Sequence, residues 1–262
     1  MPEAASAHAG AIDQVIYLVH YLMFVLFVGW GIFFAYVLVR FRQRRNPKAS
    51  YTGVKSHVSQ WLEISVAVIE GVLLVGFSIP LWAQRVDRIP PVSQSTLVRV
   101  VAQQFAWNVW YPGADGVFGK QDLSLVDEAT NPLGLDRSDP AAKDDITLIN
   151  QIHIPVNKPA IIHLSSKDVI HSFSLPHMRI KQDVIPGMRI PVWFQPTITT
   201  AEMRRQKGQE DFNYEIACAQ LCGNSHYSMH GFLTVDTPEE YAAWMEQEAE
   251  RVKGSGEDDW AQ

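Results

Sequence analysis

The chain has 262 residues, of which 47% are hydrophobic, and a formal net charge of −6 at pH 7. This length and apolar content fit one ordinary domain together with membrane segments, and they exclude a large multidomain protein. The charge is uneven, because residues 86–262 carry 24 acidic and 15 basic residues, whereas residues 1–85 carry 4 and 7. The second part is expected to attract a basic partner, or else to be an ordinary solvated acidic surface.

The first 85 residues predict a transmembrane hairpin behind a short N-terminal outer segment, residues 1–14. Val15–Val39 contains no Asp, Glu, Lys or Arg, and Leu62–Ala83 contains only two charged residues. About 20 apolar residues are enough to cross the hydrocarbon core of a bilayer. Residues 15–85 are therefore expected to form the hairpin, with spans at about 15–39 and 62–83.

The loop between the spans, residues 40–61, contains six basic residues and no acidic residue. Such a run could bind nucleic acid, but the positive-inside rule of membrane proteins explains it more simply. We therefore expect the loop on the cytoplasmic side of a bacterial-type inner membrane. Both termini and everything after residue 85 are then expected on the outer, periplasmic side.

After Pro91 the sequence changes to short alternating segments separated by Gly, Pro and Asn, which is typical of β-structure. Six segments are expected to be strands: Leu97–Gln103, Gln151–Ile154, Ala160–Ser165, Ile190–Phe194, Tyr214–Ala217 and Gly231–Val235. Regularly repeated strands favour a Greek-key sandwich or barrel over residues 86–251. Residues 112–145 are acidic and turn-rich, and we expect a surface insertion that has a function or is partly disordered.

A helix is expected near the end of the chain. Thr237 is followed by Pro238, and Glu240 stands three residues after Thr237. A threonine N-cap, a proline at the first helical position and a glutamate at the third predict a helix start. The helix is expected over about residues 238–251, with residues 252–262 as a tail.

The chemistry of the chain is concentrated in Cys218–Met229, which holds both cysteines of the protein together with His226 and Met229. Thiolate, imidazole and thioether are soft-to-borderline donors that suit copper better than calcium or magnesium. A disulfide between Cys218 and Cys222 is an alternative in an exported domain. It leaves the histidine and the methionine unexplained.

Zinc or a single copper explains this loop less well than two coppers. Structural zinc rarely uses Met, and a blue-copper site needs only one Cys with two His and a weak Met. Two thiolates shared by two coppers would use both cysteines but require a second histidine. His171 is the best source, because it follows the strand-like run Ala160–Ser165 and can face inward, although a lone His there is more often a packed core residue.

Three segments resemble subunit II of the haem-copper cytochrome c oxidases: the Cys218–Met229 loop, Asp168–His171 and Ile180–Gly187. With the two spans, the resemblance covers most of residues 15–250. It implies a cupredoxin-like domain behind the hairpin and a dinuclear copper-A centre that holds two copper ions. The implied ligand set comprises bridging thiolates from Cys218 and Cys222, terminal imidazoles from His171 and His226, and weak contacts from Met229 and the backbone carbonyl of Gln220.

One position of the ligand loop departs from the family. Many relatives have glutamate where this chain has Gln220, and that side chain also binds a magnesium ion shared with the catalytic subunit. A neutral amide is a poorer ligand for a hard cation. The sequence therefore argues against magnesium here, whereas the carbonyl role of Gln220 is unaffected. Asp168 and Asp183 are expected to hold loops by hydrogen bonds.

The segment Gln103–Tyr111 resembles the aromatic segment through which electrons reach the copper centre of the family. Relatives place tryptophan directly after the glutamine, whereas this chain has Phe105 there and Trp107 two residues later. Phe105 or Trp107 is therefore the candidate point of electron input. Trp110 is expected to be ordinary core packing.

Two glutamates lie in the second span. Glu63 resembles the family glutamate at the mouth of a proton-uptake path, and an ordinary interfacial charge is an equal alternative. Glu70 has no family counterpart. Because an ionisable group inside a bilayer is costly, Glu70 is expected to contact a neighbouring subunit.

The resemblance implies that the chain takes single electrons from a free or tethered cytochrome c and passes them to a haem-bearing catalytic subunit of a proton-translocating oxidase, which reduces O2 to water. A quinol oxidase subunit would not need the copper ligands, and the copper domain of nitrous oxide reductase would lack the paired spans. A membrane-tethered copper-binding or copper-chaperone protein is the remaining alternative, and it would hold copper exchangeably.

Overall fold

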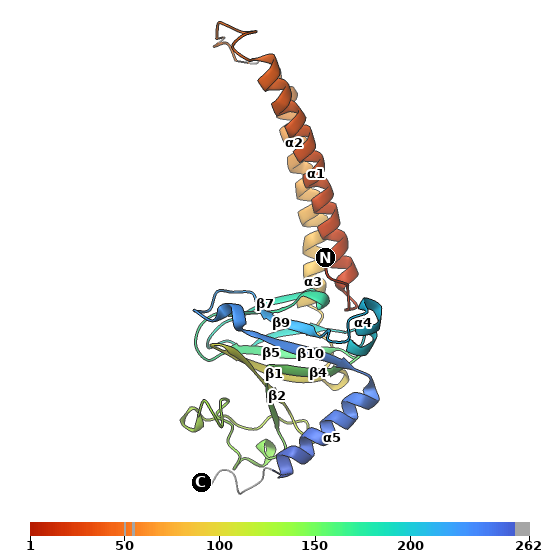
Figure 1. Cartoon of the computed structure of the whole chain (residues 1–262), viewed down its shortest axis with the longest axis vertical. Coiled ribbons are helices and arrows are strands. Elements are labelled where there is room, and N and C mark those ends of the chain that lie inside the picture. Colours follow the sequence, from red (N-terminus) through yellow and green to blue (C-terminus); the bar gives the residue numbers. More distant parts are fainter. Residues whose placement is uncertain (50, 54–55, 255–262) are drawn as a thin grey trace. The chain divides into compact units, whose positions relative to one another are not determined.

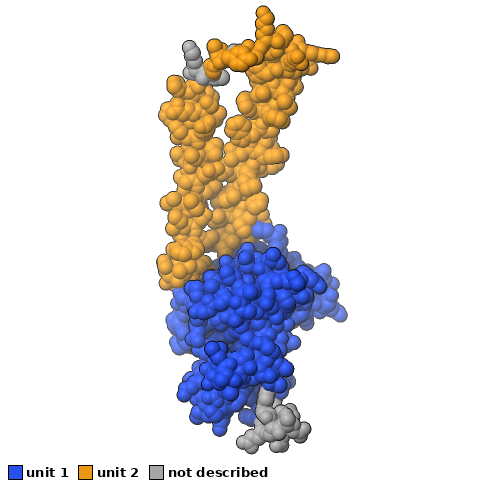
Figure 2. Space-filling view, turned by 90° about the vertical axis from the view of Figure 1, so that its left-hand side faces the viewer, with its two compact units in different colours: residues 1–9, 89–262 blue, residues 10–88 orange. Residues whose placement is uncertain are grey.

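The computed structural model describes residues 1–49, 51–53 and 56–254. Figure 2 shows its two compact units, residues 10–88 and a second unit that combines residues 1–9 with the chain from residue 89 onward. Lys55 of the basic loop lies outside the described residues. So does most of the expected tail, residues 255–262.

Residues 10–88 contain two long apolar helices. The first is α1 (Ala9–Arg40), and the second consists of α2 (Val58–Val72), a π-helical turn (Leu73–Ser78) and α3 (Ile79–Val86). Their most apolar stretches have mean hydropathies of 2.5 and 2.2, and none of either stretch is buried. A rise of about 1.5 Å per residue makes both helices long enough to cross a bilayer, with apolar side chains facing outward along their length.

The π-helical turn has a local cause in the sequence. Pro80, at the start of α3, has no N–H to donate, and its ring crowds the carbonyl four residues earlier. Widening the preceding turn relieves this conflict without ending the helix. The second helix is therefore continuous from Val58 to Val86 and extends beyond both ends of the expected span.

The other unit is a sandwich of two five-stranded sheets (Figure 1). One sheet has the order β3 (Ile146–Ile149), β2 (Ala106–Tyr111), β1 (Thr96–Gln103), β5 (Ala160–Ser166) and β8 (Ile190–Phe194). The other has the order β4 (Gln151–Pro155), β10 (His230–Asp236), β9 (Tyr214–Cys218), β6 (His171–Leu175) and β7 (Ile180–Val184). The expected architecture of two apolar helices followed by a β-sandwich is confirmed.

Burial along the strands explains which of them the sequence could predict. Buried and partly exposed residues alternate along β1, so its inward face is visible as a pattern of period two. In β2 the five residues from Trp107 to Tyr111 are all buried, and most of β6 is buried as well. A strand covered on both faces shows no alternation. This is why β2 and β6 were not among the expected strands.

The N-terminal segment belongs to the β-sandwich unit. The N–H of Ala5 donates to the carbonyl of His177 at 2.9 Å, and the N–H of Thr197 donates to the carbonyl of Ala5 at 2.9 Å. Ala5 is completely buried, and the hydroxyl of Ser6 donates to the carbonyl of Met178 at 2.8 Å. The chain is thus fixed to the sandwich before α1 begins at Ala9, earlier than the expected start of the span.

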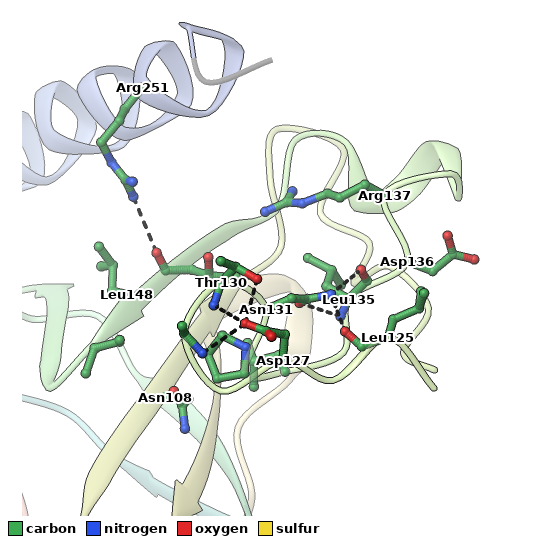
Figure 3. A pocket seen from close by; sticks show the side chains of 15 residues that line it. Asn108, Leu125, Asp127, Thr130, Asn131, Leu135, Asp136, Arg137, Leu148 and Arg251 are labelled. Carbon is green, nitrogen blue, oxygen red and sulfur yellow. Dashed lines mark hydrogen bonds between the residues drawn. The ribbon is translucent and has the colours of Figure 1, made fainter. Parts of the chain in front are cut away.

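Residues 112–145 connect β2 to β3 as a series of turns, and the structure describes all of them. The function or partial disorder expected for this insertion stays a prediction. Together with β3 and the end of α5 (Pro238–Gly254), the insertion surrounds a cleft of about 720 Å³ whose lining includes Leu133, Leu148 and Arg251 (Figure 3). Trp110 is fully buried and packs on Phe118 at the base of the insertion, so its expected core role is confirmed.

Helix α5 begins as its sequence predicts. The hydroxyl of Thr237 accepts from the N–H of Glu240 at 3.2 Å, and the Glu240 carboxylate accepts from the N–H of Thr237 at 2.9 Å. These reciprocal bonds satisfy two N–H groups at the helix start. Trp244 of α5 then stacks on His153 with ring centroids 4.4 Å apart, which anchors the helix on the sheet that contains β4.

Candidate metal centre

Strand pairing brings the two ligand-bearing segments together. β6 and β9 are antiparallel neighbours with Phe173 opposite Cys218, so His171 and Cys218 lie at the same end of the sheet. His171 is the first residue of β6 and is completely buried. Its Nδ1 atom lies 3.9 Å from the Sγ atom of Cys218. The expected second histidine is therefore beside the cysteine loop; it follows β5, as expected, and is also the first residue of the next strand, β6.

The two cysteines face each other without forming a bond. Their Sγ atoms are 3.9 Å apart and both thiols are free, whereas a disulfide would need a separation of about 2.0 Å. Cys222 is only 4% exposed. Burial, followed by the neighbouring Cys218, raises the pKa of the Cys222 thiol to about 11. A metal that binds there must therefore displace a proton.

The remaining donors come from the same loop. The Nδ1 atom of His226 lies 3.6 Å and the Sδ atom of Met229 lies 3.7 Å from the Sγ atom of Cys222. The carbonyl oxygen of Gln220 lies 3.2 Å from the Sγ atom of Cys218. The loop is closed at its base, where the N–H of Cys218 donates to the carbonyl of Met229 at 3.2 Å. The structure thus gathers all six residues that the resemblance implied.

These separations suit metal binding. Donors that share one metal at about 2.0–2.3 Å, in tetrahedral geometry, lie roughly 3.5 Å from one another. The donor atoms of His171, Cys218 and Cys222 all lie within 4.8 Å of one another. The centre offers two thiolates, two imidazoles and a thioether, which is a set for a soft or borderline metal such as copper.

Asp168 orients the buried imidazole. Its Oδ1 atom lies 2.9 Å from the Nε2 atom of His171, and its Oδ2 atom accepts from the N–H of Gln104 at 2.7 Å. Burial of Asp168 acts to raise its pKa, but the hydrogen bonds from His171 and from two backbone N–H groups outweigh this and lower it. The carboxylate keeps the Nε2 proton in place and leaves Nδ1 free to face Cys218. The hydrogen-bonding role expected for Asp168 is confirmed.

Gln104 is a contact that no sequence pattern indicated. Its side-chain amide donates to the backbone carbonyl of Cys222 at 2.5 Å, although the two residues are 118 positions apart. A motif search looks for donors within one segment and cannot detect such a pair. The only available signal was the place of Gln104 within the segment Gln103–Tyr111, as the glutamine directly before Phe105.

The two candidates for electron input differ in exposure. Trp107 is completely buried, with its ring edge-on to those of His171 and Phe173 at centroid distances of 6.2 and 5.4 Å. It therefore cannot touch a partner protein directly. Phe105 is partly exposed and lies against the ligand loop at Gly223. Glu63 and Glu70 lie on α2 in the helical unit, and their roles stay predictions.

The fold and the site define a class of protein. It is a β-sandwich with a Cys, His and Met metal centre, attached to two apolar helices of membrane-spanning length.

The comparisons with known proteins identify the family. Residues 96–235 match the family described as cytochrome c oxidase subunit II, periplasmic domain. The alternative cytochrome c oxidase subunit 2 of Bradyrhizobium diazoefficiens is 31% identical over 240 residues, which cover 91% of this chain and 80% of that protein. The cytochrome c oxidase subunit 2 of Cereibacter sphaeroides is 28% identical, with 81% and 67% covered. The chain belongs to the cytochrome c oxidase subunit II family.

A solved structure is also similar. The crystal structure of the periplasmic domain of subunit II of cytochrome oxidase of Bradyrhizobium japonicum is 26% identical, with a TM-score of 0.42, and the match covers 63% of this chain and 99% of that one. Membership of the family makes the chain a membrane-anchored subunit of a haem-copper oxidase complex, an oxidoreductase, with its cupredoxin-like domain on the outer side.

Proposed function

We propose that this chain is the subunit at which single electrons enter the oxidase, through a dinuclear copper centre held by His171, Cys218, Gln220, Cys222, His226 and Met229. The observation that carries the proposal is the pair of free thiols 3.9 Å apart, each with its own imidazole neighbour. Two thiolates and two imidazoles would fill a single tetrahedral metal, so the carbonyl of Gln220 beside Cys218 and the thioether of Met229 beside Cys222 are the further donors that favour a second metal.

The six residues have different roles in metal binding. The thiolates of Cys218 and Cys222 would hold both metals, the imidazoles of His171 and His226 would each bind one of them, and Met229 and the carbonyl of Gln220 would add weak contacts. When bound, the two coppers supply a site that takes up one electron and spreads it over both metals. The strand ends and the closed loop hold the donors in place, so that little rearrangement accompanies electron transfer.

The topology follows from two features of the chain. Residues 1–9 belong to the same compact unit as the chain from residue 89 onward, and Ala5 and Ala7 are hydrogen-bonded within it. The basic loop joins the opposite ends of the two helices and is expected in the cytoplasm. We therefore place the N-terminal segment, the sandwich and α5 on the periplasmic side of a bacterial inner membrane.

The proposed electron donor is a cytochrome c, free or tethered. The acidic balance of residues 86–262 supports this, because it would attract a basic partner and speed their encounter. Phe105 is the proposed input residue, since it is the partly exposed one of the two candidates. Reduction of O2 is assigned to the haem-bearing subunit. Magnesium is not proposed, because Gln220 offers only a neutral amide in place of the family carboxylate.

The test is metal analysis and electron paramagnetic resonance of the full-length protein in detergent, loaded with copper. We expect two coppers per chain that resist exchange and a mixed-valence signal delocalised over both. One readily exchanged copper per chain would favour the copper-chaperone alternative. A disulfide between Cys218 and Cys222 in the active protein would contradict the proposal.

A further inference from the structure

We propose that Gln104 is a positioning residue of the metal centre, which holds the backbone of Cys222 and the imidazole of His171 in a fixed relation. This inference rests on the copper centre proposed above and adds a residue outside both ligand-bearing segments. Gln104 and Phe105 form the connection between β1, which ends at Gln103, and β2, which begins at Ala106.

The side chain of Gln104 holds the cysteine loop. Its Nε2 atom donates to the carbonyl oxygen of Cys222 at 2.5 Å. The Sγ atom of Cys222 is in contact with three other donors, from Cys218, His226 and Met229. The amide therefore anchors the peptide of a residue that contacts much of the donor set.

The backbone of Gln104 holds the histidine. Its N–H donates to Oδ2 of Asp168 at 2.7 Å, and Oδ1 of the same carboxylate lies 2.9 Å from Nε2 of His171. One residue thus contacts both halves of the ligand set, directly at Cys222 and through one carboxylate at His171. Partners of this kind set the orientation and electronic character of metal ligands.

The ligand loop is shaped to accept this contact. Gly223 has a φ of +141°, and a Cβ atom there would lie 2.6 Å from Nε2 of Gln104 and 3.0 Å from Cζ of Phe105. A larger residue would displace the side-chain amide of Gln104 or the ring of Phe105, and a φ of +141° is one that residues with a Cβ atom rarely adopt. Glycine is therefore favoured at the point where the two segments meet.

The donor also affects the electron affinity of the site. An amide N–H directed at the carbonyl of a ligand places the positive end of a dipole near the centre. This stabilises the reduced form, so that loss of the donor lowers the reduction potential.

The experiment uses the full-length, copper-loaded protein in detergent and two substitutions. Gln104→Ala removes the side-chain amide but keeps the backbone N–H, and Gln104→Glu keeps the shape but cannot donate when ionised. Gln195→Ala is the matched control, because the Gln195 amide makes the same kind of bond, to the carbonyl of Asn157 at 3.1 Å, between turns that carry no ligand.

We expect both Gln104 variants to bind two coppers. Gln104→Ala should lose copper to a chelator roughly two- to tenfold faster than wild type, which corresponds to one lost hydrogen bond. Its reduction potential should fall, and that of Gln104→Glu should fall further because a negative charge is added. Gln195→Ala should match wild type in both measurements.

Two results would overturn the inference and leave the proposed function intact. One is wild-type copper loss and potential in both Gln104 variants. The other is faster copper loss with an unchanged potential in both, which would show only loosened packing. If the wild-type protein itself gave no mixed-valence signal, the proposed copper centre would fail and this inference with it.

Discussion

Two irregular segments of the β-sandwich unit, the ligand loop Cys218–Met229 and the insertion at residues 112–145, use their polar side chains in opposite ways. In the ligand loop, side chains converge on one another at 3.6–3.9 Å. In the insertion, the Asp122 and Asp127 carboxylates accept from N–H groups two or three residues later. The ligand loop leaves its sulfur and nitrogen atoms available to a metal, whereas the carboxylates of the insertion already accept hydrogen bonds within its own turns.

The number of acidic residues in a segment does not by itself indicate a metal site. The insertion is rich in acidic residues, and an acidic cluster could be taken for a cation site. Seven of its carboxylates accept from backbone N–H groups of the insertion, namely those of Asp115, Asp122, Asp127, Asp136, Asp139, Asp144 and Asp145. Convergence of donors, and not their abundance, therefore separates a binding site from a stable loop.

The largest effect is expected when one of the two thiols of the ligand loop is removed. Cys218→Ser or Cys222→Ser should abolish the two-copper signal, because a hydroxyl cannot replace a bridging thiolate. Electron paramagnetic resonance of the copper-loaded full-length protein is the measurement. Tyr227→Phe is the control, since Tyr227 is in the same loop but is 88% exposed, and it should keep the signal. An unchanged signal in either serine variant would refute the assignment of both thiols as ligands.

A smaller effect is expected from the residue that orients His171. Asp168→Asn replaces the carboxylate that contacts Nε2, and it should weaken copper binding by about 10- to 100-fold, as measured by competition with a chelator. Asp183→Asn is the matched control, because Asp183 is an exposed carboxylate on the neighbouring strand β7. Equal affinities in the two variants would show that the Asp168 contact does not support the metal.

How much of the site the sequence predicted depends on the kind of interaction. The two cysteines, His226 and Met229 could be selected as candidate ligands because they occur together in one short loop, and the resemblance to the family implied His171 and the carbonyl of Gln220. The contact of Gln104 with Cys222 could not be predicted, because glutamine is common on protein surfaces. The contact also depends on how the connection between β1 and β2 approaches Cys222 in the folded chain. The exposure of Phe105 and the burial of Trp107 likewise required the packed structure.

The fold likewise has features that could be predicted from the sequence and features that could not. Helix α5 was predictable because its capping residues act locally, through Thr237 and Glu240. The attachment of the N-terminal segment could not be predicted, because Ala5 is held by backbone hydrogen bonds to His177 and Thr197. Backbone hydrogen bonds do not depend on the identity of the side chains, so no sequence pattern indicates them. The four-residue strand β3 was also missed, because so short a segment does not display a period.

Within the ligand loop, the thioether should matter less than the thiols. Met229→Leu should keep both coppers but shift the reduction potential, because leucine preserves the buried volume and removes only a weak donor, 3.7 Å from the Sγ atom of Cys222. Redox titration of the copper-loaded full-length protein is the measurement. Complete loss of metal would show instead that the loop cannot form without Met229.

The smallest effect is expected in the insertion. Hydrogen bonds from Ser124, Thr130 and Ser138 lower the pKa values of Asp122, Asp127 and Asp136, respectively. A carboxyl whose pKa is lower in the folded state stabilises fully above its unfolded value, near 3.9, and loses this contribution as the pH falls through the folded value. The thermal midpoint of the full-length protein should therefore fall as acid is added below about pH 4.

Replacing these three aspartates together by asparagine separates turn formation from charge. Asparagine keeps the accepting oxygen that closes each turn but does not titrate. The triple variant should be slightly less stable than wild type at neutral pH, because the charge-assisted part of each hydrogen bond is lost, and it should show a weaker loss of thermal midpoint in acid. The same replacement leaves the copper signal unchanged if the insertion uses its carboxylates only on its own turns. Loss of that signal would mean that the two segments are not independent.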